Sequence, residues 1–223
     1  MRMSLRGNQE LFEGSGEKMN TEFQGKNIVL IGFMGAGKTS LGKTVSKMLG
    51  IPYLDTDNLI EDAEGMTVSE IFARKGEAYF RQKETALLGD LSKREGSYVL
   101  SVGGGLPLRE ENRPLLHEAG CVIYLKVGID TLQRRLEKDT KRPLLHQGEG
   151  TLREKISRIL KAREPLYMEA ADVVIVNDHK PFRLAAQEIA DLYCASAEGG
   201  IWFHDILQYL KATKTEMIRR VQI

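Results

Sequence analysis

Cysteine is scarce in this sequence, which limits how the chain can be stabilised. Only 2 of the 223 residues are cysteines, Cys121 and Cys194, and they lie far apart without metal-type spacing. A disulfide framework is therefore not expected. The shortage is typical of a reducing compartment, so we expect a cytoplasmic protein.

Long apolar runs and a surplus of basic charge are also lacking. No segment approaches the roughly 20 apolar residues of a membrane-spanning helix, and the first residues lack the apolar core of a secretory signal. Lys and Arg total 32 against 31 Asp and Glu, and Trp202 is the single tryptophan. Nucleic-acid-binding proteins usually carry a basic excess and stacking aromatics. We therefore expect neither a membrane nor a nucleic acid as a partner.

What the sequence does contain is an alternation of short apolar runs with longer amphipathic segments. The runs that predict buried strands are 27–31, 52–54, 98–102, 121–125 and 172–176. Capping-box spacings at 67–70 and 151–154 predict helix starts. Strands alternating with helices predict an α/β fold of three layers, in which helices cover both faces of a five-stranded parallel sheet.

The chain divides into three parts by composition. Residues 1–25 are polar and lack periodicity, so we expect a flexible leader. Residues 26–195 have the length of one compact domain. Residues 196–223 carry Ile206 and Leu210 at helical spacing, which predicts a helical C-terminal extension. The sequence assigns no role to either extension.

Residues 32–39 read GFMGAGKT and match the phosphate-binding pattern G-x-x-x-x-G-K-[ST] at each fixed position. Glycines let the backbone N–H groups converge at a helix N-terminus, which attracts anions. An apolar strand pattern precedes the segment and a helical pattern follows it, so we interpret it as a nucleotide site rather than a chance match. Lys38 is expected to reach the terminal phosphates and Thr39 to bind magnesium.

Two carboxylates follow the second strand, at Asp55 and Asp57. Asp55 can hold a magnesium-bound water near Thr39, and Asp57 can accept a hydrogen bond from an alcohol that receives the phosphate. Alternatively, Asp57 only caps the next helix, where aspartate is favoured. Beside a phosphate-binding loop we favour the role in substrate binding.

The glycines 103–105 end the third strand and would permit a ligand to approach the backbone closely. An ordinary strand-to-loop turn explains them equally well. Arg81, Arg142 and Arg163 stand out by position, yet a lone arginine is usually a solvated surface charge. An anionic substrate would need such partners, because arginine binds carboxylates through two parallel hydrogen bonds.

Six segments in order, GFMGAGKTSLG, LDTDNLIE, FRQKE, SVGGG, RPLL and REPLY, resemble the shikimate kinases across residues 27–193. The resemblance implies a P-loop fold of five parallel strands. It also implies transfer of the γ-phosphate of ATP to the 3-hydroxyl of shikimate, with Mg²⁺ as cofactor, in aromatic amino-acid biosynthesis. We expect ATP and shikimate as the small-molecule partners, and a monomer.

The resemblance further implies a role for each matching residue. The chemistry would depend on Lys38, Asp57 and Arg142, the last on a mobile lid at 138–150. The ATP site would comprise Gly35, Ala36, Gly37, Lys38, Thr39, Ser40, Arg135, Arg142 and Pro181, with adenine between Arg135 and Pro181. The shikimate site would comprise Asp57, Gly103, Gly104, Gly105, and Arg81 with Arg163 as a clamp on the carboxylate. The metal site would comprise Thr39 and, through water, Asp55.

Two other functions compete with this interpretation. A kinase for another small alcohol, such as gluconate, would keep the phosphate loop but would not need the Arg81–Arg163 pair together with the SVGGG segment. A nucleotide-dependent switch would fit the D-x-x-G spacing at 62–65, although no N-K-x-D segment follows. The helical pattern at 62–65 favours a coincidence.

Overall fold

The computed structural model describes residues 27–137, 149–178 and 180–198. The expected leader, the lid with Arg142 and nearly all of the C-terminal extension lie outside the described residues. Within them the strands are β1 (Asn27–Ile31), β2 (Tyr53–Asp55), β3 (Val99–Ser101), β4 (Gly120–Lys126) and β5 (Val173–Val176).

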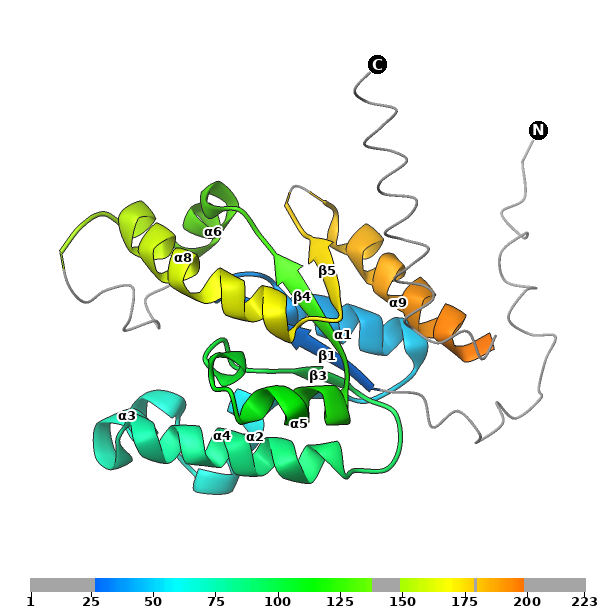
Figure 1. The fold of residues 1–223 in the computed structure, drawn as a ribbon, viewed down its shortest axis with the longest axis horizontal. Coiled ribbons are helices and arrows are strands. Elements are labelled where there is room, and N and C mark those ends of the chain that lie inside the picture. Colours follow the sequence, from blue (N-terminus) through cyan, green and yellow to red (C-terminus); the bar gives the residue numbers. More distant parts are fainter. Residues whose placement is uncertain (1–26, 138–148, 179, 199–223) are drawn as a thin grey trace, which may run out of the picture.

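The strands form one sheet in the order β2-β3-β1-β4-β5, and every pair is parallel (Figure 1). β1 lies at the centre, and all 5 of its residues are buried. A strand covered on both faces reads as an unbroken apolar run, which is why the strand at 27–31 was predictable. The expected five-stranded parallel sheet is confirmed.

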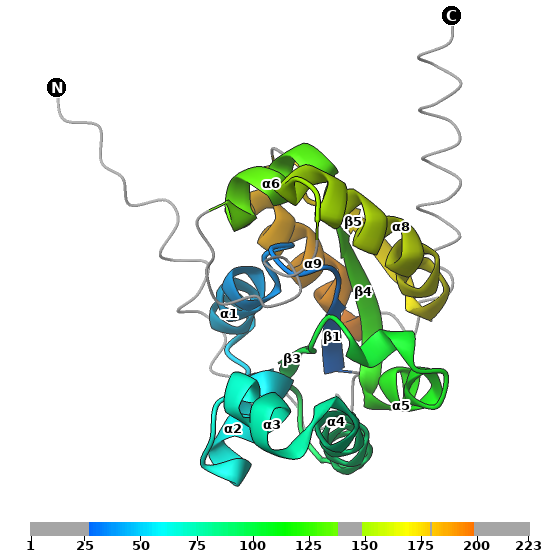
Figure 2. The same ribbon diagram turned by 90° about the vertical axis from the view of Figure 1, so that its left-hand side faces the viewer.

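Helices cover both faces of the sheet. Those described are α1 (Lys38–Leu49), α2 (Thr56–Glu64), α3 (Val68–Lys75), α4 (Glu77–Ser92), α5 (Asn112–Ala119), α6 (Ile129–Leu136), α8 (Leu152–Ala170), α9 (Phe182–Glu198) and the 3₁₀ turn η1 (Leu106–Leu108). α1 and α9 pack together on one face, and α5 and α8 lie on the other (Figures 1 and 2). No helix in these described ranges is long and apolar enough to span a membrane.

α2, α3 and α4 form a group beside the β2 edge of the sheet (Figure 2). The buried apolar part of their contact consists of Ile60, Ile71 and Phe80. This small cluster is separate from the main core, but α4 also enters the main core through Leu88 and Leu91, so the group is tied to the rest of the domain both through α4 and where β2 runs into α2.

Both predicted capping boxes are present. The Thr67 hydroxyl accepts from the backbone of Glu70, and Thr151 does the same with Glu154. Helix α5 was not predicted, because Pro114 and the surrounding charges obscure its periodicity. The proline is tolerated there because it lies in the first turn, where its missing N–H has no helical partner.

Candidate active site

The phosphate-binding loop joins β1 to α1, at the carboxyl edge of the sheet. Gly37 caps α1 in the left-handed conformation, with φ 96°, and a Cβ there would lie 2.9 Å from the ring of Phe182. Backbone conformation and space therefore both require glycine. The Lys38 ammonium donates to the carbonyls of Gly32 at 2.8 Å and Phe33 at 3.3 Å, so its charge lies across the loop.

Asp55 ends β2 and organises the region beside Thr39. Its Oδ2 accepts from the Tyr53 hydroxyl at 2.8 Å and lies 3.5 Å from the Thr39 hydroxyl. Burial raises the pKa of Tyr53 to about 12, and the contact with Asp55 also raises it, so the phenol remains a donor. The hydroxyl of Thr39 and the carboxylate of Asp55 together offer the hard oxygen ligands that suit Mg²⁺.

The described ranges contain no group of three or more His, Cys, Asp or Glu side chains arranged for a metal. Mg²⁺ in kinases usually takes only one or two protein oxygens and completes its shell with phosphates and water. The pair Thr39 and Asp55 therefore fits this cofactor better than it fits a metal held entirely by protein.

The Asp57 carboxylate faces the glycine segment that follows β3. Asp55, not Asp57, is the N-cap of α2, and its Oδ1 accepts from the Asp57 backbone N–H at 3.1 Å. The capping role considered for Asp57 therefore falls to its neighbour. A Cβ placed on Gly103 would lie 2.8 Å from Asp57 Oδ1 and 2.7 Å from Glu84 Oε1. The backbone at Gly103 thus lies directly against two carboxylates.

Glu84 is a component of the site that the sequence analysis missed. It is completely buried on α4, and its Oε2 accepts from Arg81 Nη1 at 2.6 Å. Burial raises the pKa of Glu84 to about 7, although Arg81 lowers it. Oε1 is buried without a hydrogen-bond partner. The spacing of three residues, which places the two side chains on one face of a helix, was the available signal.

Arg81 lies beneath the third glycine. A Cβ on Gly105 would lie only 2.5 Å from Arg81 Nη1 and 2.7 Å from its Cζ. Nε and Nη2 of Arg81 bind Glu77, at 3.2 and 2.9 Å, and Nη1 binds Glu84. A guanidinium has five N–H groups, so these bonds leave donors for a ligand. A side chain at Gly103 or Gly105 would displace Asp57, Glu84 or Arg81, so these two glycines do more than make a turn.

Arg163 approaches the same place from α8. The Tyr167 hydroxyl, one turn further along, donates to the Gly104 carbonyl at 2.6 Å. Burial raises the pKa of Tyr167, and the nearby charges of Arg163 and Arg81 lower it. Both arginines therefore lie close to one hydroxyl, although they belong to helices far apart in the sequence.

Arg135 lies on the nucleotide side of the site. Its Nη1 donates to the carbonyls of Gly35 and Ala36, both at 3.1 Å. Burial lowers its pKa. Its guanidinium lies 5.5 Å from the ring centre of Phe182, which directly follows the exposed Pro181. Phe182 was not predicted; the residue is 41% exposed, and its ring is the aromatic surface that Arg135 faces.

The comparisons with known proteins agree with this geometry. The sequence profile of shikimate kinase matches residues 34–193. The chain belongs to the shikimate kinase family. A shikimate kinase of Actinobacillus pleuropneumoniae serotype 5b is 41% identical over 167 residues, covering 75% of this chain and 95% of the relative. That of Dictyoglomus turgidum is 44% identical over 157 residues, covering 69% and 89%.

Solved shikimate kinases share the fold. The structure titled shikimate kinase from Acinetobacter baumannii in complex with shikimate has a TM-score of 0.72 and 37% identity, and the match covers 81% of this chain and 100% of that one. Together these matches confirm the predicted shikimate kinase activity. The D-x-x-G segment at 62–65 forms the end of α2 and its cap, so it is helical, as expected, and not a switch loop.

Proposed function

We propose that this shikimate kinase transfers the γ-phosphoryl group of ATP to the 3-hydroxyl of shikimate at the carboxyl edge of the sheet. One observation carries the proposal. A Cβ on Gly104 would lie 3.4 Å from the carbonyl oxygen of Gly32 and 3.8 Å from the backbone nitrogen of Met34. The glycine segment beside Asp57 is therefore in contact with the phosphate-binding loop, and phosphoryl transfer depends mainly on such positioning.

On the nucleotide side, the residues from Gly35 to Ser40 hold the phosphates. Lys38 turns its ammonium from the loop carbonyls to the β- and γ-phosphates when they are present. Thr39, and Asp55 through a water, would hold Mg²⁺, which would supply positive charge to offset that of the phosphates. Arg142 remains a predicted contact of the transferred group.

On the acceptor side, Arg81 and Arg163 bind the shikimate carboxylate. Two guanidinium groups that approach one point from different helices suit a carboxylate, because each makes charge-assisted hydrogen bonds with it. Asp57 orients the acceptor hydroxyl and takes its proton as the phosphoryl group arrives. Gly103, Gly104 and Gly105 form the backbone surface on which the ring rests.

At the far end of the nucleotide, Arg135 packs on the adenine. The planar guanidinium of Arg135 stacks well on aromatic faces. Phe182, with Pro181 beside it, offers the aromatic surface nearest to that guanidinium, so we assign the base to this corner. We also infer a cytoplasmic protein, which is supported by the shortage of cysteine. The monomeric state expected from the family resemblance stays a prediction.

A coupled assay of ADP release tests the proposal. The protein is incubated with ATP, Mg²⁺ and either shikimate, gluconate or no acceptor. Rapid ADP release is expected only with shikimate, and phosphorus NMR of the product should place the phosphate on the 3-hydroxyl. Equal release with gluconate would contradict the assignment of Arg81 and Arg163, because gluconate differs from shikimate in the shape around its carboxylate.

A further inference from the structure

Tyr167 contacts the glycine segment of residues 103–105 beside the phosphate loop. Its side chain is completely buried, and its hydroxyl donates to the Gly104 carbonyl at 2.6 Å. The Tyr124 ring lies 5.3 Å away and fixes the orientation of the phenol. A Cβ on Gly104 would lie 3.6 Å from the Tyr167 hydroxyl and 3.4 Å from the Gly32 carbonyl oxygen, so Gly104 is in close reach of both Tyr167 and the phosphate loop.

A glycine segment keeps one backbone conformation only when contacts from other residues restrict it. Without side chains, its backbone has more conformations available than that of any other residue. The carbonyl of Gly104 and the N–H of Gly105 belong to one planar trans peptide and point in opposite directions. A hydrogen bond that fixes the carbonyl towards Tyr167 also fixes the N–H of Gly105 away from α8.

The same hydroxyl lies near the two arginines assigned to the carboxylate. Arg163 precedes Tyr167 by one helical turn, which places both side chains on one face of α8. Burial raises the pKa of the Tyr167 hydroxyl, and the charges of Arg163 and Arg81 act against that rise, which places both guanidinium groups near the phenol. The Tyr167 phenol is thus in contact with the glycine segment and close to Arg81 and Arg163, the pair assigned to the substrate carboxylate.

We propose that Tyr167 is a positioning residue that sets the spacing between the phosphate-binding loop and the shikimate carboxylate. It does so by holding the peptide after Gly104, and through it the surface on which the acceptor rests. The inference rests on the proposed function, since it concerns the acceptor side of the same reaction. Tyr167 itself takes no part in the transfer of the proton or the phosphoryl group.

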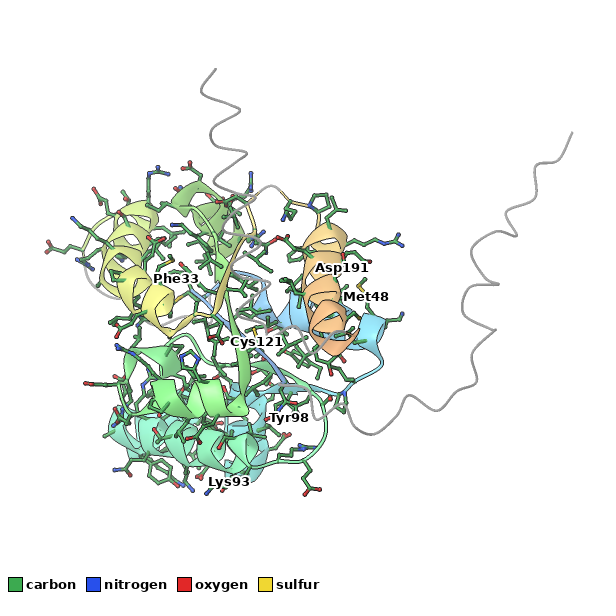
Figure 3. All side chains as sticks on the ribbon, turned by 45° about the vertical axis from the view of Figure 1, so that its right-hand side comes forward. Phe33, Met48, Lys93, Tyr98, Cys121 and Asp191 are labelled. Atoms are coloured by element: carbon green, nitrogen blue, oxygen red, sulfur yellow. The ribbon has the colours of Figure 1, made fainter. Side chains whose placement is uncertain are left out.

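The variant Tyr167→Phe tests this inference, because it removes the hydroxyl and keeps the ring. A matched control exists in Tyr98, which is also buried and whose hydroxyl donates to the Leu91 carbonyl at 2.6 Å. Tyr98 immediately precedes β3 and so lies at the amino edge of the sheet, whereas Phe33 follows β1 at the carboxyl edge with the site (Figure 3). Both variants lose one buried hydrogen bond, so their Tm values should fall by similar amounts.

Only Tyr167→Phe should change the kinetics. Loss of a net hydrogen bond that positions the acceptor predicts about a tenfold rise in the KM for shikimate and a fall in kcat, with the KM for ATP within about twofold of normal. Tyr98→Phe should keep all three constants. The shikimate Kd from titration calorimetry without ATP should rise in parallel with its KM.

Three outcomes would overturn the inference. Normal shikimate constants in a folded Tyr167→Phe protein would show that the hydroxyl serves stability alone. Equal changes in the constants for ATP and shikimate, or the same changes in Tyr98→Phe, would show a general loss of structure. If the unaltered protein released no ADP in response to shikimate, the proposed function would fall and this inference with it.

Discussion

Glu84 and Arg81 lie one turn apart on α4, and the arginine donates to the buried carboxylate at 2.6 Å. The other oxygen of Glu84 lies against Gly103, close to the Asp57 carboxylate. A buried acid therefore connects the arginine assigned to the substrate carboxylate with the aspartate assigned to the substrate hydroxyl. Its charge state affects both.

Replacing Glu84 by Gln should change how stability depends on pH. Burial raises the pKa of Glu84 from its ordinary 4.5 to about 7, so the folded protein holds this proton more tightly than the unfolded chain. Its contribution to the free energy of unfolding is complete below the ordinary pKa and is lost as pH rises to about 7. Glu84→Gln lacks that loss, so its stability relative to wild type should increase across this window.

Urea unfolding measured between about pH 5 and pH 8 tests this expectation. Glu118→Gln is the control, because Glu118 is exposed on α5, and its curve should run parallel to that of the wild type. A constant difference between Glu84→Gln and wild type at every pH would contradict a raised pKa.

Asp57→Asn should separate binding from chemistry. The amide keeps the size of the side chain and can still contact the acceptor hydroxyl, but it cannot take a proton. We expect kcat to fall by about a hundredfold or more, as for loss of a general base, with near-normal shikimate affinity. Because Asp55 and not Asp57 caps α2, Tm should change little. Unchanged turnover would remove Asp57 from the mechanism.

Gly103→Ala should abolish activity although it adds only one carbon. The new Cβ would lie within 2.8 Å of both Asp57 and Glu84, closer than carbon and oxygen approach without displacement. Gly89→Ala is the control, since a Cβ there meets nothing within 4 Å on helix α4. Alanine favours a helix over glycine by about 1 kcal/mol, so Gly89→Ala should raise Tm and keep activity. An active Gly103→Ala enzyme would show that the segment can move away.

Arg163→Ala should weaken shikimate binding and leave ATP binding almost intact. Loss of hydrogen bonds between charged groups predicts a rise of about tenfold to a hundredfold in the KM for shikimate. Arg158→Ala removes an exposed arginine from the same helix and should have no effect. A matching rise in the KM for ATP would indicate a folding defect rather than a lost clamp.

Phe182→Ala should weaken ATP binding and leave shikimate binding almost intact, the reverse of Arg163→Ala. It removes the ring that faces Arg135 and packs on Gly37, so the KM for ATP should rise about threefold to tenfold, in line with a lost stacking contact. Leu184→Ala removes a more exposed apolar side chain from the same helix and should leave both KM values unchanged. A change confined to the KM for shikimate would contradict the position assigned to the base.

The sequence was sufficient to predict the parts of the fold that follow local patterns. The apolar runs located the strands, and the phosphate loop was identified by its spacing and its flanking elements. Contacts between distant residues could not be read in this way. The hydroxyl of Tyr167 meets a carbonyl 63 positions earlier, and Arg135 binds carbonyls about 100 positions away. The burial of Glu84 likewise depends on how α4 packs, so its three-residue spacing from Arg81 could indicate a shared helix face but not a buried position in the site.

The packing at Gly103 and Gly105 has a consequence for inhibitors. A Cβ at either position would lie within 2.8 Å of a charged side chain of the site. A compound that rests on this backbone touches atoms common to every amino acid. A substitution at Gly103 or Gly105 that hindered such a compound would also displace Asp57, Glu84 or Arg81, so we expect resistance gained at these positions to lower activity as well.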